Sequence, residues 1–244
     1  MVINDSVVFI PIPKNASWSV EDTCIKYGFN LKYPMVAWEN EIKLGIKNPQ
    51  KHAHASTSFL IDVFGTNYEY ICIIRNSTDR FISAWKYFIE AMIKEFPEEA
   101  STKLKKLDNK FIIDFFTENF IKFKAAYSSF DIRAELLEKL LTKIGLNKYY
   151  EIGKDFKKRY AIHILSFTSQ YHWTESNLVN IKKFDFNKLE NFEKYLSDKF
   201  KVDFKLIHTN KSKLDYCAIE KTPELIEFVE KYIDGSIKSK KSII

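Results

Sequence analysis

The chain has 244 residues, enough for one α/β domain with a substantial core, and we expect a single domain over residues 1–244. Its 45% hydrophobic and 16% aromatic residues exclude disorder as a description of the whole chain. The net charge of +6 comes from lysines spread among acidic residues, so anionic ligands are favoured only mildly and nucleic acid is not an expected partner.

The cysteines and the hydropathy pattern indicate the cellular compartment of the protein. Cys24, Cys72 and Cys217 are widely spaced in apolar surroundings, which argues against a disulfide framework and against a zinc site. No apolar run reaches the roughly 18 residues of a membrane span, and the amino terminus does not resemble a signal peptide. We therefore expect a cytoplasmic protein with buried thiols and no membrane span; its oligomeric state is left open.

The first segment with a clear pattern is an apolar run followed by a basic turn. Residues 7–10 predict a strand that is covered on both faces, and two prolines end it. A helix is predicted from Ser17 to Tyr27, where Ser19 and Asp22 fit a capping box. In such a unit, the N–H groups of the first helical turn can hold a phosphate or sulfate, and Lys14 would add a positive charge. A strand followed by an ordinary capped helix is the alternative interpretation.

Two histidines, His52 and His54, follow a loop predicted for residues 30–50 and precede a helix predicted for 56–64. In an extended backbone they would point to the same side. An imidazole that titrates near neutral pH is suited to accept a proton from a reacting hydroxyl group. A hydrogen-bonded structural pair remains the alternative, and a metal site is not expected, because the other histidines show no metal-ligand spacing.

A second strand-turn-helix pattern begins at residue 68. Residues 68–74 predict another buried strand, and helical spacing starts at Ser77. Arg75 would lie at the carboxyl end of this strand and Ser83 early in the helix. We expect these two side chains to converge on one point.

The rest of the chain predicts four helices and one more strand, after a charged connection at 98–110. The helices are predicted at 111–127, 132–144, 186–200 and 223–234, and the strand at 178–184. The first two helices belong to a helical elaboration around residues 111–165. The whole order predicts the α/β class, with three layers and a mostly parallel central sheet flanked by helices.

Two stretches resemble a known family. Pro13-Lys14-Asn15-Ala16-Ser17-Trp18-Ser19 resembles the 5′-phosphosulfate loop, P-K-(T/N)-(G/A)-(S/T)-(S/T)-(S/W), of sulfotransferases that use 3′-phosphoadenosine 5′-phosphosulfate (PAPS). Arg75-Asn-Ser-Thr-Asp79-Arg80-Phe-Ile-Ser83-Ala-Trp85 resembles their 3′-phosphate signature, R-(D/N)-P-x-x-R-x-x-S-x-(Y/W). Ser77 stands where that signature has proline, and we expect this departure to affect the rigidity of the turn more than the contacts.

Two shorter stretches extend the resemblance. His52-Ala-His54 is similar to an H-x-H element of the uronosyl 2-O-sulfotransferases, in which a histidine acts as the base, and this favours a saccharide acceptor. Gln170-Tyr-His-Trp173 resembles a glutamine and aromatic element that precedes a strand in the same family.

The resemblance implies the P-loop-like sulfotransferase fold and the transfer of a sulfuryl group from PAPS to an acceptor hydroxyl, without a metal. Lys14 would meet the charge on the leaving oxygen, and His54, or secondly His52, would be the base. The implied cofactor-binding residues are Lys14, Asn15, Ala16, Ser17, Trp18, Ser19, Arg75 and Ser83.

Two other functions stay open. The first is a non-catalytic nucleotide-binding or glycan-binding protein of the same fold, against which the intact Lys14 and the histidine pair argue. The second is a kinase or another nucleoside triphosphate enzyme of related fold. The motif G-x-x-x-x-G-K-(S/T) occurs nowhere in the chain, and this argues against the second.

Overall fold

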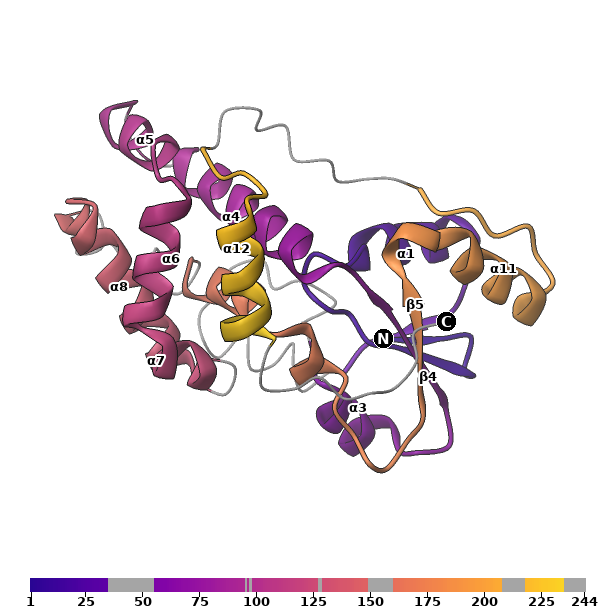
Figure 1. Ribbon diagram of the computed structural model, residues 1–244. Coiled ribbons are helices and arrows are strands. Elements are labelled where there is room, and N and C mark those ends of the chain that lie inside the picture. Colours follow the sequence, from indigo (N-terminus) through magenta and orange to yellow (C-terminus); the bar gives the residue numbers. More distant parts are fainter. Residues whose placement is uncertain are drawn as a thin grey trace.

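The computed structural model describes residues 1–34, 55–94, 96, 98–126, 129–148, 160–207 and 218–234. Within these residues the protein is α/β, and its core is a mixed, open sheet of five strands in the order β3-β1-β2-β4-β5 (Figure 1). The strands are β1 (Val2–Ile3), β2 (Val7–Phe9), β3 (Leu31–Lys32), β4 (Glu69–Ile74) and β5 (Ile181–Asp185).

The pairing corrects the expectation of a mostly parallel sheet. β2, β4 and β5 are parallel neighbours, in register at Phe9 with Ile71 and at Ile74 with Asp185. β1 pairs antiparallel with both β2 and β3. The sheet is mixed because β1 and β2 are joined by a tight turn in which Asn4 and Asp5 have φ of 45° and 51°, and a turn of this length can join only antiparallel strands.

Helices cover both faces of the sheet, because successive side chains of a strand point to opposite faces. Phe9, Ile71 and Ile73 pack against α1 (Ser17–Lys26) and α11 (Leu189–Phe200). On the other face, Val8, Tyr70 and Cys72 pack against α3 (Thr57–Phe64) and Trp173. The central strands are buried on both faces, which explains why their sequences are continuously apolar.

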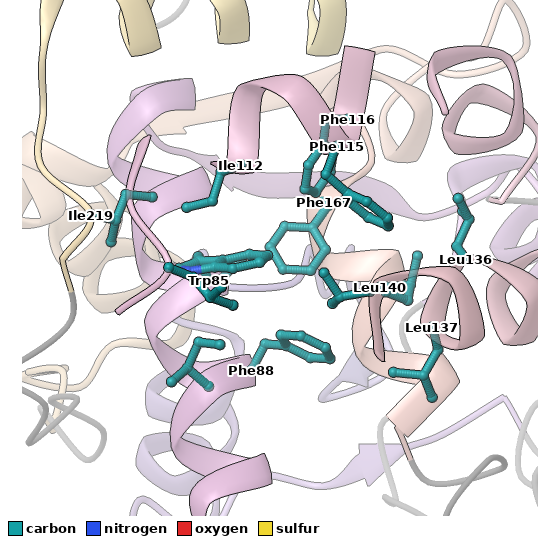
Figure 2. Close-up of a cluster of buried hydrophobic side chains, with 14 of the residues drawn as sticks. Trp85, Phe88, Ile112, Phe115, Phe116, Leu136, Leu137, Leu140, Phe167 and Ile219 are labelled. Atoms are coloured by element: carbon teal, nitrogen blue, oxygen red, sulfur yellow. The ribbon is translucent and has the colours of Figure 1, made fainter. Parts of the chain in front are cut away.

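A separate apolar cluster fills the helical part of the molecule. In Figure 1, α4 leads from the end of β4 into this group of helices. Figure 2 shows Trp85 and Phe88 of α4 packed with Phe116 and Phe167. The helices of this part are α4 (Ser77–Ile93), α5 (Glu98–Lys105), α6 (Asn109–Glu118), α7 (Phe120–Ala125), α8 (Phe130–Lys143), α12 (Pro223–Phe228) and the π-helical turn η4 (Val229–Ile233).

Three short 3₁₀ turns complete the described structure: η1 (Ile162–Phe167), η2 (Gln170–Trp173) and η3 (Phe186–Lys188). Two sequence-based predictions about the helical part of the molecule are wrong. The charged segment 98–110 is not merely a solvated connection, because α5 buries Ala100 and Leu104. The helix predicted at 111–127 is broken at Asn119, whose side chain donates to the carbonyl of Phe115 at 2.8 Å.

The thiols of Cys24 and Cys72 are free and buried, as predicted, while Cys217 lies outside the described residues. None of the helices that the structure describes is long and apolar enough to cross a membrane.

Candidate functional site

The two turns singled out in the sequence meet at one edge of the sheet. β2 and β4 are adjacent and parallel, so the segments that follow their carboxyl ends emerge side by side. Nη1 of Arg75 lies 3.5 Å from the backbone carbonyl oxygen of Lys14. The side chain of Arg75 therefore reaches the backbone of a residue that lies 61 positions earlier in the sequence.

The backbone of the first turn has an unusual conformation. Lys14 and Ala16 have φ of 66° and 61°, in the left-handed region where residues other than glycine are uncommon. Ala16 is the N-cap of α1 and is followed by right-handed helical residues, an alternation that in proteins generally can direct successive N–H groups toward one anion. The first intrahelical bond runs from the N–H of Val20 to the carbonyl of Ala16, at 3.0 Å.

This start of α1 corrects the predicted capping box. Ser19 is the third residue of the helix, and no side chain caps the N-terminus at Ala16. Ser17 and Ser19 are buried, whereas Trp18 is 39% exposed at the same helix start. Ala16, the N-cap of α1, has no side-chain oxygen that could accept an N–H of the first turn, which suits a helix end that accepts an anion.

The ammonium group of Lys14 lies over an aromatic ring, with Nζ 3.9 Å from the ring centroid of Tyr87 on α4. Burial, and then the positive charge of Arg75, lowers the pKa of Lys14 to about 8, against the opposing effect of the Glu90 carboxylate. Burial penalises the charged form of an amine, and a bound anion would reverse this shift.

His163 of η1 is a member of the site that the sequence did not indicate. Its ring centroid lies 5.3 Å from that of Tyr87, the ring that Lys14 contacts. Burial, and then the charge of Lys14, lowers the pKa of His163 to about 4, so its imidazole is neutral at pH 7. No motif could have revealed this arrangement, because it joins positions 14, 87 and 163 only through the fold.

The guanidinium group of Arg75 has an aromatic partner as well. Its Cζ lies 4.6 Å from the ring centroid of Phe186 in η3, at the end of β5. Burial lowers the pKa of Arg75, and the carboxylate of Asp79 opposes this shift. Ser83 is half-buried on α4, and within the described residues no hydrogen bond joins it to Arg75, so their convergence stays a prediction.

Asp79 and Arg80 hold α4 to other segments rather than to each other. The carboxylate of Asp79 lies 2.8 Å from Nζ of Lys221. Arg80 is fully buried and donates to the carbonyl oxygens of Ser166, at 2.9 Å, and of Thr168. Both residues therefore have structural contacts.

Some predicted site residues lie outside the described residues, namely the candidate bases His52 and His54. In the part of the chain that the structure does describe, no three side chains of His, Cys, Asp or Glu are grouped so that they could hold a metal ion.

Comparisons of the chain with protein-family models, with curated proteins and with solved structures gave no significant match.

Proposed function

We propose that the protein is a sulfotransferase that moves a sulfuryl group from PAPS to an acceptor hydroxyl, on a saccharide. The observation that supports this most is the meeting of the two loops that resemble the PAPS-binding motifs. They follow adjacent parallel strands, and Nη1 of Arg75 approaches the carbonyl of Lys14 to 3.5 Å. One nucleotide with anionic groups at its 5′ and 3′ positions could contact both loops.

The residues at the first loop suit the leaving-group side of an in-line displacement. A bond forms between sulfur and the acceptor oxygen while the bond between sulfur and the bridging phosphate oxygen breaks, and charge builds on the departing oxygen. Lys14 and the N–H groups at the start of α1 would stabilise that charge, much as in phosphoryl transfer. The products are a sulfate ester and adenosine 3′,5′-bisphosphate.

The second loop would bind the 3′-phosphate. A guanidinium group can bind a phosphate through two parallel hydrogen bonds, which gives direction as well as strength. Arg75 would supply this contact and Ser83 a hydroxyl. The guanidinium group lies against the ring of Phe186, a contact that leaves its positive charge unneutralised.

The acceptor hydroxyl must lose its proton to a base as it attacks. We propose a histidine, with His54 as the first candidate and His52 as the second. The structure adds His163 as a third candidate by its position beside the ring that Lys14 contacts, but its pKa, lowered to about 4, makes it a weaker base than an ordinary imidazole. Proton acceptance completes the balance of the reaction.

Nucleotide-dependent stabilisation tests the assignment of the second loop. Adenosine 3′,5′-bisphosphate should raise the melting temperature more than adenosine 5′-phosphate does, and Arg75→Ala should abolish the difference. Equal stabilisation of the wild-type protein by both nucleotides would refute the 3′-phosphate site.

Turnover requires a second measurement. Incubation with sulfur-labelled PAPS and a panel of glycans and small hydroxyl compounds should label at least one acceptor. Tight binding of the bisphosphate without any labelled product would favour the non-catalytic binding protein instead.

A further inference from the structure

The side-chain amide of Gln170 joins the two loops of the candidate site. Its Oε1 accepts hydrogen bonds from Nδ2 of Asn15, at 3.0 Å, and from the backbone N–H of Arg75, at 3.2 Å. Its Nε2 donates to the backbone carbonyl of Arg75, at 2.7 Å, and to Oγ of Ser77, at 3.1 Å. A carboxamide has two donors and two acceptor positions, so all four are used.

This contact is specific in direction and is shielded from water. Gln170 is 1% exposed. If its amide were reversed, an NH₂ group would face the N–H of Arg75 and the NH₂ of Asn15, and an oxygen would face the Arg75 carbonyl. Only the observed orientation therefore pairs donors with acceptors.

Each loop is held by hydrogen bonds at, or directly beside, the residue that carries its basic side chain. Asn15 directly follows Lys14, and its Nδ2 also donates to the carbonyl of Ile73 on β4, at 2.8 Å. On the other loop, Gln170 holds both backbone groups of Arg75 itself. The distance between the two anion-binding loops is thus set through one buried amide.

The buried carboxylate of Asp234 accepts hydrogen bonds from two residues next to this contact. Ser77 Oγ donates to Oδ2 of Asp234, and Ser169 Oγ donates to Oδ1 at 2.8 Å. Asp234 is 3% exposed and directly follows η4. Ser77 and Ser169 thus connect both sides of Gln170 to the carboxyl-terminal part of the described chain.

We propose that Gln170 is a positioning residue that fixes the separation of the Lys14 and Arg75 loops, so that a ligand with two anionic groups binds much more tightly than ligands with either group alone. This inference rests on the proposed function. Once one anionic group is bound, the other binds in an intramolecular step, and rigid spacing removes the cost of ordering the second loop. Loss of the tie should therefore weaken the coupling between the two groups and leave each separate contact nearly intact.

The coupling can be measured by calorimetric titration with adenosine 3′,5′-bisphosphate, adenosine 3′-phosphate and adenosine 5′-phosphate. In Gln170→Leu, the preference for the bisphosphate over each monophosphate should fall by roughly tenfold or more, in the range of typical coupling between sites. The two monophosphates should each bind within about threefold of their wild-type affinity, because neither needs both loops at once. Ser77→Ala, which removes a single partner of the amide, should cause a smaller fall in the same direction.

Asn119→Leu is the matched control, because it also removes a buried side-chain amide, between α6 and α7 in the helical part of the molecule. It should lower the melting temperature without changing the preference for the bisphosphate. A preference that persists in Gln170→Leu overturns the positioning role, and if that variant does not fold, Ser77→Ala decides by the same criterion. A wild-type protein without any preference overturns the proposed function, and the positioning role with it.

Discussion

The pKa of Lys14 leads to a prediction about the pH dependence of anion binding. Because this pKa is lowered to about 8, raising the pH from 7 to 9 should deprotonate most of the Lys14 side chains in the ligand-free protein. The protonated fraction falls from roughly nine-tenths to about one-tenth over this range. The affinity for adenosine 3′,5′-bisphosphate should then fall by up to roughly tenfold, since the ligand needs the charged amine.

Neighbouring groups should not produce this change. Burial raises the pKa of Tyr87, so its phenol stays neutral between pH 7 and 9. His163 is already neutral, because its pKa is lowered to about 4. Phosphate groups lose their second proton near pH 6, so the ligand keeps its charge across the range.

The stability of the protein without ligand should change with pH in the direction opposite to the ligand affinity. Lys14 has a pKa of about 8 in the folded state and 10.5 as its ordinary value, so between these values the unfolded chain binds more protons. The contribution of Lys14 to the free energy of unfolding should therefore rise with pH while ligand affinity falls. Urea unfolding of the wild type and of Lys14→Met, compared at pH 8 and 10, isolates this contribution.

The assay is calorimetric titration of the bisphosphate at pH 7, 8 and 9, with Lys14→Arg as the control. A guanidinium group does not titrate in this range, so the variant should lose the pH dependence even if it binds more weakly. An affinity of the wild-type protein that is constant over the range, or an equal slope in Lys14→Arg, would refute the reasoning.

Three further predictions concern the base and the supports of the site. His54→Ala should keep nucleotide binding but reduce transfer of labelled sulfate by roughly 10²- to 10⁴-fold, and full activity would move the base to His52 or His163. Arg80→Met should lower the free energy of unfolding by about 2–4 kcal/mol in urea titrations, because two buried carbonyl groups lose their donor. Ser77→Ala should lower the free energy of unfolding by about 2 kcal/mol, because the buried carboxylate of Asp234 loses a donor. Ser77→Pro should lower it by less, because proline is favoured at the first position of a helix. Equal losses in the two Ser77 variants would argue against this role of the turn.

The sequence predicted the parts of the fold that have a periodic or continuously apolar pattern. The runs at 7–10 and 68–74 correspond to β2 and β4, because strands buried on both faces leave few polar residues between them. β1 and β3 were missed, since each has only two residues and such short strands show no periodicity. α5 was missed because its many charged side chains hide the single apolar face that it buries.

Some contacts of the candidate site could be predicted from the sequence, and others could not. The proximity of Lys14 and Arg75 was foreseeable, because each follows a strand and parallel strands end at one edge. The contacts of Lys14 with Tyr87, and of Tyr87 with His163, depend on how α4 and η1 pack, and no local pattern encodes such packing.

Ser77, the departure from the family signature, has internal contacts that the sequence did not indicate. From the sequence, replacing proline by serine was expected to change turn rigidity more than the contacts with the 3′-phosphate, and this stays a prediction. The structure adds that the Ser77 hydroxyl joins Gln170 to Asp234. Proline restricts only its own φ and the residue before it. A hydroxyl instead makes the position of the Arg75 loop depend on two distant segments, the turn at Gln170 and the end of η4. Changes at η4 should therefore reach the second loop through Ser77, although η4 contributes none of the side chains proposed to bind an anion.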